Sequence, residues 1–159
     1  MRYKVAPPAR SLDFLRTVRA AVPLVPDDAA DCCLAIQRAT DVGDRERARE
    51  YLTFLRALGL VTETDRGYHR TRNGLDRDAL ATAYHDRVFL VDELFRAVET
   101  GADSPAAAFE AVREAIPRWE RERDPAWERN WRERVEQLLD WAVVFGCLTV
   151  EDGHFAVSQ

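Results

Sequence analysis

Apolar residues recur at three- and four-residue intervals in two successive blocks of the chain, and each block ends in stretches typical of strands. In the first block, Ser11 is a typical N-cap for a predicted helix that Pro23 ends. Pro26, followed by two aspartates, opens a second predicted helix that stops near residues 40–43. The pattern predicts that this helix buries Ala30, Cys33 and Leu34, with Cys32 as a further candidate.

The most periodic segment of this block is a third predicted helix, which Asp44 caps and Gly59 ends. Its apolar stripe consists of Ala48, Tyr51, Leu52, Leu55 and Leu58. After it, residues 60–62 and 68–71 have strand-like composition, and residues 65–67 are typical of the turn between two antiparallel strands. The first block is therefore predicted to be three helices followed by a hairpin.

The second block repeats this order with longer helices. Its first stripe predicts one helix over about residues 78–99, closed by Gly101. Ser104 and Pro105 open a second helix, which Pro117 kinks or ends. Pro125 precedes the longest predicted helix, and residues 146–157 again follow the order glycine, strand, acidic turn, strand. The first stripe consists of Leu80, Val88, Val91, Leu94, Phe95 and Val98, and that of the longest helix of Trp127, Trp131, Val135, Leu138, Leu139 and Ala142.

An internal repeat and a change of charge place the domain boundary near residues 73–75. Aligning Gly59 with Gly146 leaves Arg66 as one extra residue in the first turn. Residues 1–75 hold 13 basic and 10 acidic residues, a net charge of +3, whereas residues 76–159 hold 10 and 18, a net charge of -8. We therefore predict two domains, residues 1–75 and 76–159, with different partners. The same alignment pairs Thr62 with Thr149 and Asp65 with Asp152.

Composition narrows the class of protein. With 47% hydrophobic and 32% charged residues, the chain is expected to fold. It has no apolar run of membrane-spanning length, and its start, MRYKVAPPAR, lacks the apolar stretch of a secretory signal, so a cytoplasmic location is expected. Lys4 is the only lysine among 23 basic residues, a bias we associate with GC-rich genomes and salt-adapted cytoplasm. The cysteines indicate neither disulfides nor zinc and are expected to be small buried residues, Cys32, Cys33 and Cys147.

The segments "YLTFLRALGLVTETDRGYHRT" and "LLDWAVVFGCLTVEDGHFAV" carry a family resemblance. In each, a third helix ends at a Leu/Phe-Gly-hydrophobic corner and feeds a two-stranded hairpin, an arrangement that resembles the winged helix-turn-helix fold. The resemblance covers nearly the whole chain. It implies a mainly α (α+β) protein of two tandem winged-helix domains, each of three helices and a two-stranded β-hairpin wing. The scarcity of lysine suggests a halophilic archaeon as the source of this tandem winged-helix protein. The family usually places its third helix in the DNA major groove and its wing beside the phosphate backbone, but it also serves as a protein-docking module.

The positive half carries candidate DNA-binding side chains on three elements. Arginine can pair with guanine or grip phosphate, and Arg45 and Arg49 are four residues apart and hence neighbours on one helix face. The leading segment adds Arg2, Lys4 and Arg10. The third helix and hairpin supply the other candidates, Arg45, Arg47, Arg49, Thr53, Arg56, Arg66, His69, Arg70 and Arg72.

A second interpretation of the same helix is a solvated face on which Glu46 and Glu50 pair with nearby arginines. In the second half, the equivalent helix and its acidic hairpin would repel phosphate, so this copy is expected to contact protein or a second copy of the chain. The leading hypothesis is a DNA-binding transcriptional regulator. The alternative is a tandem winged-helix adaptor that binds only proteins, and a third, weaker possibility is a second domain that senses a ligand.

Tryptophans and histidines add little further chemistry. Trp119, Trp127 and Trp131 are explained first by core packing and second as anchors of a protein interface. The three histidines are widely spaced, and there is no metal-ligand spacing, nucleophile arrangement or phosphate-binding loop. We therefore expect no enzymatic activity, no cofactor and no metal.

Overall fold

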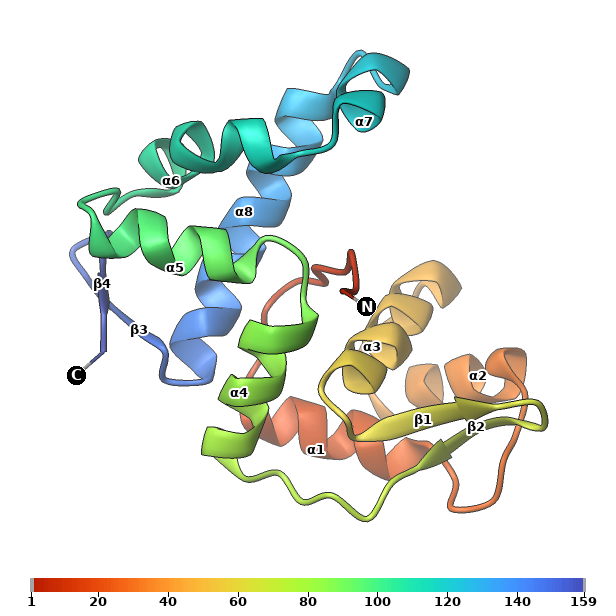
Figure 1. The fold of residues 1–159 in the computed structure, drawn as a ribbon. Coiled ribbons are helices and arrows are strands. Elements are labelled where there is room, and N and C mark those ends of the chain that lie inside the picture. Colours follow the sequence, from red (N-terminus) through yellow and green to blue (C-terminus); the bar gives the residue numbers. More distant parts are fainter. Residues whose placement is uncertain (1, 159) are drawn as a thin grey trace. The chain divides into compact units, whose positions relative to one another are not determined.

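The structure, a computed structural model that describes residues 2–158, consists of two compact units, residues 1–88 (unit 1) and residues 89–159 (unit 2) (Figure 1). This division differs from the expected boundary after residue 75, because helix α4 (Arg77–Arg87) belongs to unit 1. The Phe54 ring packs edge-on against Tyr84 of α4, with ring centroids 6.2 Å apart. The backbone N–H of Tyr3 also donates to the carbonyl of Arg87 at 2.6 Å. Contacts distant in sequence therefore bind α4 to the first unit.

Unit 1 contains the three helices that its sequence predicts. Each begins after a side-chain N-cap, and the oxygens of Ser11, Asp28 and Asp44 accept backbone N–H groups of the first helical turns at 2.7 to 3.1 Å. The caps predicted at Ser11 and Asp44 are thus confirmed. The helices are α1 (Leu12–Ala21), α2 (Ala29–Ala39) and α3 (Arg45–Ala57).

The buried side of α2 differs from the prediction. Cys32, Cys33 and Ile36 face the interior, whereas Ala30 is exposed and Leu34 is 43% exposed. Ile36 lies three and four residues after the two cysteines and completes their stripe, so Leu34 lies on the other side of the helix. The predicted stripe through Ala30 and Leu34 is therefore wrong, and α2 presents an apolar side chain to solvent.

The wing of unit 1 consists of two antiparallel strands, β1 (Val61–Thr64) and β2 (Gly67–Arg70), joined by a two-residue turn. Asp27, in the segment between α1 and α2, adds an isolated antiparallel bridge to Tyr68 that the sequence did not reveal. The N–H of Tyr68 donates to the carbonyl of Asp27 at 2.7 Å, and the N–H of Asp27 donates back to Tyr68 at 3.0 Å. The wing is thereby fastened to the start of α2.

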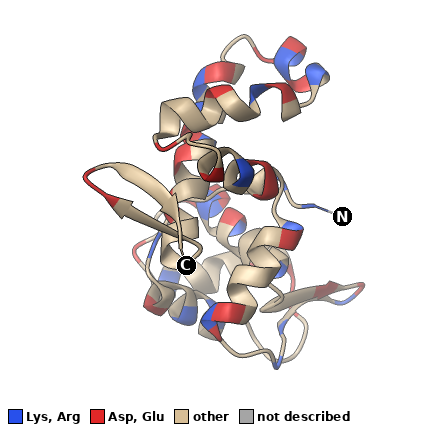
Figure 2. Ribbon diagram, turned by 60° about the vertical axis from the view of Figure 1, so that its left-hand side comes forward, with Lys and Arg blue, Asp and Glu red and all other residues tan. Residues whose placement is uncertain are grey.

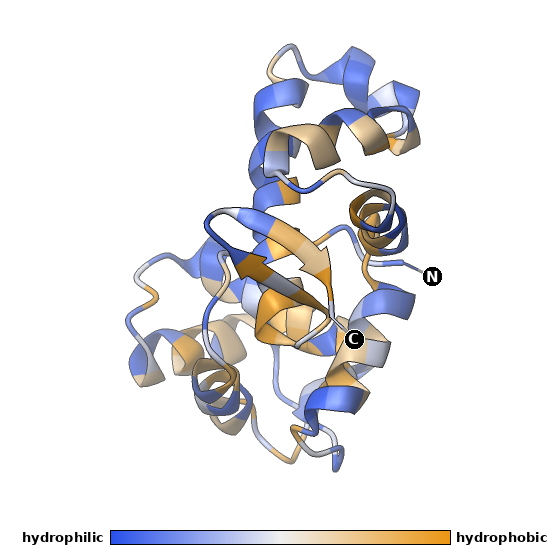
Figure 3. Ribbon diagram, turned by 90° about the vertical axis from the view of Figure 1, so that its left-hand side faces the viewer, coloured by the Kyte–Doolittle hydropathy of each residue, from blue (hydrophilic) through white to orange (hydrophobic). Residues whose placement is uncertain are grey.

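Unit 2 repeats three helices and a wing with a short insertion. Strands β3 (Leu148–Glu151) and β4 (His154–Val157) form its wing, whose strands are coloured largely as hydrophobic and whose turn is hydrophilic in Figure 3. Among the described helices, none combines the length and apolar character needed to cross a bilayer. The helices are α5 (Val91–Glu99), α6 (Pro105–Val112), the 3-10 turn η1 (Arg113–Ala115), α7 (Arg118–Arg123) and α8 (Trp127–Val144).

The single helix predicted over residues 78–99 is wrong, because the structure has two helices there. Val88 has an extended backbone, and Leu90 is left-handed with a φ of 79°. Both are buried, so the apolar periodicity continues across the break. At the break between the two helices, Val88 forms a parallel bridge with Tyr3. Such a long-range contact cannot be predicted from local spacing.

The internal repeat is confirmed by matching backbone hydrogen bonds. Past the third helix, Leu60 N–H donates to the Leu55 carbonyl at 2.9 Å, and in unit 2 Cys147 N–H donates to Ala142 at 2.8 Å. Each wing is also held to the segment before its second helix, since Phe155 N–H donates to the Asp103 carbonyl at 2.8 Å, as Tyr68 does to Asp27.

Both wings have two-residue turns, Asp65-Arg66 and Asp152-Gly153. The extra residue expected in the first turn is therefore absent, and the glycine of unit 1, Gly67, lies instead at the start of β2. Along the third helices and wings, each position of unit 1 corresponds to the position 87 residues later, as Val61 does to Leu148.

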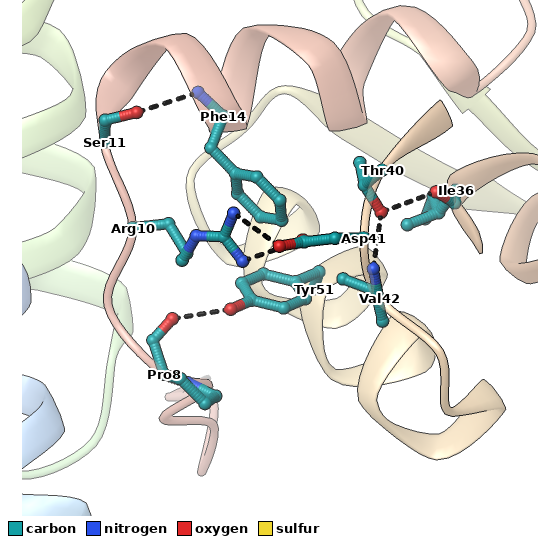
Figure 4. A network of polar contacts seen from close by, with 9 residues as sticks. All are labelled: Pro8, Arg10, Ser11, Phe14, Ile36, Thr40, Asp41, Val42 and Tyr51. Carbon is teal, nitrogen blue, oxygen red and sulfur yellow. Dashed lines mark hydrogen bonds and ion pairs between the residues drawn. The ribbon is translucent and has the colours of Figure 1, made fainter. Parts of the chain in front are cut away.

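A polar network holds the segment before α1 against α3 and the segment between α2 and α3 (Figure 4). The Tyr51 hydroxyl donates to the Pro8 carbonyl at 2.6 Å. The Arg10 guanidinium donates to the Asp41 carboxylate at 3.0 and 3.3 Å and lies 4.0 Å from the centre of the Phe14 ring. Hydrogen bonding from Arg10 lowers the pKa of Asp41. Arg10, expected among the DNA-facing cations, thus has a structural partner in unit 1.

Two of the three cysteines are buried as expected, and burial lowers the reactivity of their thiols. Burial raises the pKa of the Cys32 thiol to about 11 and also raises the pKa of Cys33, whereas Cys147 is half-buried. The thiolate is the reacting form, so a raised pKa keeps a thiol inert until higher pH. In the native protein, iodoacetamide is expected to modify Cys147 first. Mildly alkaline pH should not make Cys32 reactive, because its thiol stays protonated there. Peptide mass spectrometry over time checks this, and equal labelling of all three would contradict it.

Candidate nucleic-acid interface

The solvent-facing side of α3 carries four polar side chains, Arg45, Arg49, Thr53 and Arg56, which we call the basic ridge. With 3.6 residues per turn, these positions lie within about 80° of one another around the helix. Arg45 and Arg49 are exposed, and neither has an ion pair within the described chain. Their guanidinium groups therefore keep their donors available for an external acceptor.

The far end of the ridge is partly neutralised. Arg56 Nη1 lies 2.7 Å from Glu63 Oε1 on β1, and its guanidinium lies 5.6 Å from the centre of the Tyr3 ring. Sequence reasoning missed both partners, because nothing local connects residues 3 and 63 with α3. Thr53 is half-buried. The first two turns of α3 thus offer more available cationic charge than the last.

Arg47 does not belong to the ridge, although the sequence grouped it with Arg45 and Arg49. It lies about 160° around the helix from Arg49. Its Nη1 is 3.3 Å from Glu50 Oε1, and it lines a shallow hollow with Arg10 and Tyr51. The expected pairing of an acidic residue with a nearby arginine therefore holds for Glu50, while Glu46 stays exposed beside the ridge.

The four candidates in and after the wing lie in different settings. Arg66 is exposed at the turn, and Arg72 is exposed beyond β2. His69 pairs across the sheet with Thr62, and its Nδ1 lies 3.0 Å from the Arg70 carbonyl oxygen. Arg70 lies on the opposite, inward face of the sheet from His69, and its Nε is buried with no hydrogen-bond partner among the residues that the structure describes. Arg66 and Arg72 are the cations of this segment best placed to reach a ligand.

Unit 2 has the opposite charge along the corresponding ridge. The positions equivalent to Arg49 and Thr53 are Glu136 and Asp140, and burial, followed by the neighbouring Glu136, raises the pKa of Asp140. Arg132, equivalent to Arg45, is 3.0 Å from Glu110 Oε1. The turn of its wing is acidic, as the red tip in Figure 2 shows. Counted by unit, the net charge is +2 for residues 1–88 and -7 for residues 89–159.

The tryptophans of unit 2 are mostly internal. Trp131 is 6% exposed and packs edge-on against Phe89 at 5.8 Å, so the prediction of an interface role is wrong for this residue and the core explanation holds. Trp127 is half-buried, with the Arg113 guanidinium 4.9 Å from its ring centre. Trp119, on the inserted helix α7, is 52% exposed. It remains the one predicted interface tryptophan of the three that lies open.

The whole chain, residues 1–159, matches the family described as the Halobacterial double winged helix domain. No protein with a curated description and no solved structure matches the chain. The family description agrees with the expected halophilic archaeal source, and the two repeated units agree with its double winged helix. The chain therefore belongs to the halobacterial double winged helix family.

Proposed function

We propose that unit 1 binds double-stranded DNA through the basic ridge and the wing, and that the protein is a cytoplasmic transcriptional regulator. One observation carries this proposal: Arg45 and Arg49 are exposed neighbours on α3 without ion-pair partners in the described chain. Arginine in a groove can donate two hydrogen bonds to guanine, and winged helices commonly present their third helix to DNA. The proposed action is recognition, not catalysis.

Each element has a distinct role in this proposal. Arg45 and Arg49 would enter the major groove, while Arg66 and Arg72 would contact phosphates on either side of the wing. Unit 2, with Glu136 in place of Arg49, would be repelled by the same polyanion and is proposed to contact protein. The exposed Trp119 favours the second candidate, an adaptor that binds only proteins.

A salt titration of binding to a random-sequence duplex separates these two functions. Four available arginines would neutralise about four phosphates, so the logarithm of the association constant should fall with the logarithm of salt concentration with a slope of about -3 to -4. Fluorescence anisotropy of a labelled duplex measures it. Absence of binding at low ionic strength would reject the DNA proposal and favour the adaptor. A single strand of the same length is the control and is expected to bind more weakly.

A further inference from the structure

The solvent side of α2 in unit 1 forms an apolar surface with a charge at each end. Leu34 is 43% exposed at its centre, with Asp31 one turn before it and Arg38 one turn after it. A shallow groove of about 470 Å³ runs along this side, lined by Ala21, Asp31, Leu34, Ala35, Arg38 and Ala39. These lining residues of α2 recur at three- and four-residue spacing, so they form a single stripe.

The fold does not require an apolar residue at this place. Counting from the N-caps Asp28 and Ser104, Leu34 of α2 corresponds to Glu110 of α6, and both are exposed. Glu110 accepts hydrogen bonds from Arg113 and Arg132 within unit 2. The same helix position is therefore polar and internally satisfied in one unit and apolar and open in the other. Leu34 and the alanines of the groove therefore form an apolar patch that the fold itself does not need, and such a patch is typical of a contact surface.

The loop before α2 carries two further exposed apolar residues. Leu24 and Val25 are 67% and 73% exposed, and they lie between Pro23 and Pro26, close in the chain to Ala21 of the groove. The Pro23 carbonyl accepts the Arg70 N–H of the wing at 2.7 Å, which holds the loop in place. Proline and this hydrogen bond limit the conformations of the loop, so ordering it in a complex costs little entropy.

The charges at the two ends have no opposite partner within the described chain. No ion pair is present for Asp31 or Arg38 there. Asp31 also lies beside Asp28 and Asp27, with carboxylate oxygens within 4.8 Å of one another, and their charges raise the pKa of Asp31. A cation brought to this end of the helix would relieve that repulsion.

We infer that this surface binds a second copy of the chain, with the two α2 helices antiparallel about a two-fold axis between Leu34 and Ala35. In that arrangement Asp31 of each copy faces Arg38 of the other, and the leucines meet at the centre. A two-fold contact must be self-complementary, and a stripe with opposite charges at equal distances from an apolar centre has this property. The small Ala35 and Ala39 side chains allow the helices to approach closely.

Sedimentation equilibrium of the full chain at increasing concentration and low ionic strength tests the contact. The wild type is expected to approach the mass of a dimer. Leu34→Glu, which introduces the residue found at the equivalent position of α6, should raise the dimer dissociation constant at least about tenfold without loss of folding. Val150→Glu, at another exposed apolar residue, is the control and should leave the mass unchanged. A monomeric wild type, or a dimeric Leu34→Glu variant, would overturn the inference.

Charge reversal tests the antiparallel geometry itself. Asp31→Arg alone and Arg38→Asp alone each place like charges opposite one another and should weaken self-association. Mixing the two variants should restore a dimer, because every facing pair is then again of opposite sign. If the single variants associated as well as the wild type, or if the mixture associated no better than its components, Asp31 and Arg38 would not face each other and the antiparallel arrangement would be rejected.

This contact is independent of DNA binding. The Arg45→Ala/Arg49→Ala variant changes α3 only and is expected to sediment like the wild type. Failure of the DNA proposal would therefore leave the dimer measurements unaltered, and a monomeric protein could still bind DNA. If the ridge variant were monomeric, the surface assigned to α2 would be incorrect.

Discussion

Arg45→Ala combined with Arg49→Ala is expected to lower the affinity for duplex DNA by about 100-fold. Both side chains are exposed on one ridge without intramolecular ion pairs, so their removal deletes ligand contacts and leaves no partner in the described chain unpaired. An arginine paired with a base contributes about 1–3 kcal/mol, and about 1.4 kcal/mol corresponds to a factor of ten. Fluorescence anisotropy with the variant and the wild type at one salt concentration measures the change.

Two controls make this result specific. Arg16→Ala combined with Arg77→Ala removes the same charge from exposed positions on α1 and α4 and should change affinity only about twofold. Arg47→Ala tests the face assignment, because Arg47 points away from the ridge and pairs with Glu50. Equal losses in the ridge variant and the charge-matched control would mean that net charge alone governs binding and that no groove contact exists. Circular dichroism should show that all variants stay folded.

At high salt, Arg45 and Arg49, which have no ion pair within the described chain, are expected to contribute more to DNA binding than the net charge of unit 1 does. At molar salt the screening length is about 3 Å, so a unit with a net charge of +2 gains little from long-range attraction to DNA. Direct hydrogen bonds from guanidinium to base or phosphate act within that distance. In a halophilic protein, the positions of Arg45 and Arg49 are therefore expected to matter more than the overall charge of unit 1.

The elements that follow local rules could be predicted from the sequence. Ser11 and Asp44 predict where helices start, because their side chains accept backbone N–H groups of the first helical turn. Gly59 predicts the corner before the wing, because its backbone hydrogen bond ends the helix within a few residues. Helical spacing alone places Arg45 and Arg49 on one solvent-facing side of the third helix. The charge difference between the halves likewise depends only on composition.

The features that sequence reasoning missed depend on distant partners. The backbone of Leu90 turns left-handed next to the Tyr3–Val88 bridge, and Asp27 joins the wing because Tyr68 lies beside it. Residue type places Arg47 beside Arg49 on one solvated face, whereas the helical angle separates the two residues by about 160°. Hydrophobicity predicts a buried Leu34, but an apolar side chain can also lie exposed on the surface.

Gly67→Ala is expected to lower the free energy of unfolding of unit 1 by about 3 kcal/mol. Gly67 has a φ of 123°, a region that L-residues rarely adopt, and a Cβ there would lie 2.2 Å from the Asp27 carbonyl oxygen. Such backbone strain costs about 1–3 kcal/mol, and displacement of the wing would also break the two hydrogen bonds between Asp27 and Tyr68, each worth about 1 kcal/mol. Affinity for DNA should fall as well, because Arg66 moves with the wing.

Gly153→Ala in the second wing is the matched control. Gly153 has a φ of 78°, but a Cβ there would meet no atom within 4 Å, so only the left-handed strain of about 1 kcal/mol remains. The units can be followed separately in urea, because the four tyrosines lie in unit 1 and the four tryptophans in unit 2. Gly67→Ala should shift the tyrosine-detected transition and speed amide exchange at Tyr68, whereas Gly153→Ala should shift the tryptophan transition by a smaller amount. Equal shifts would mean that the contact between wing and α2 segment adds nothing to the stability of unit 1.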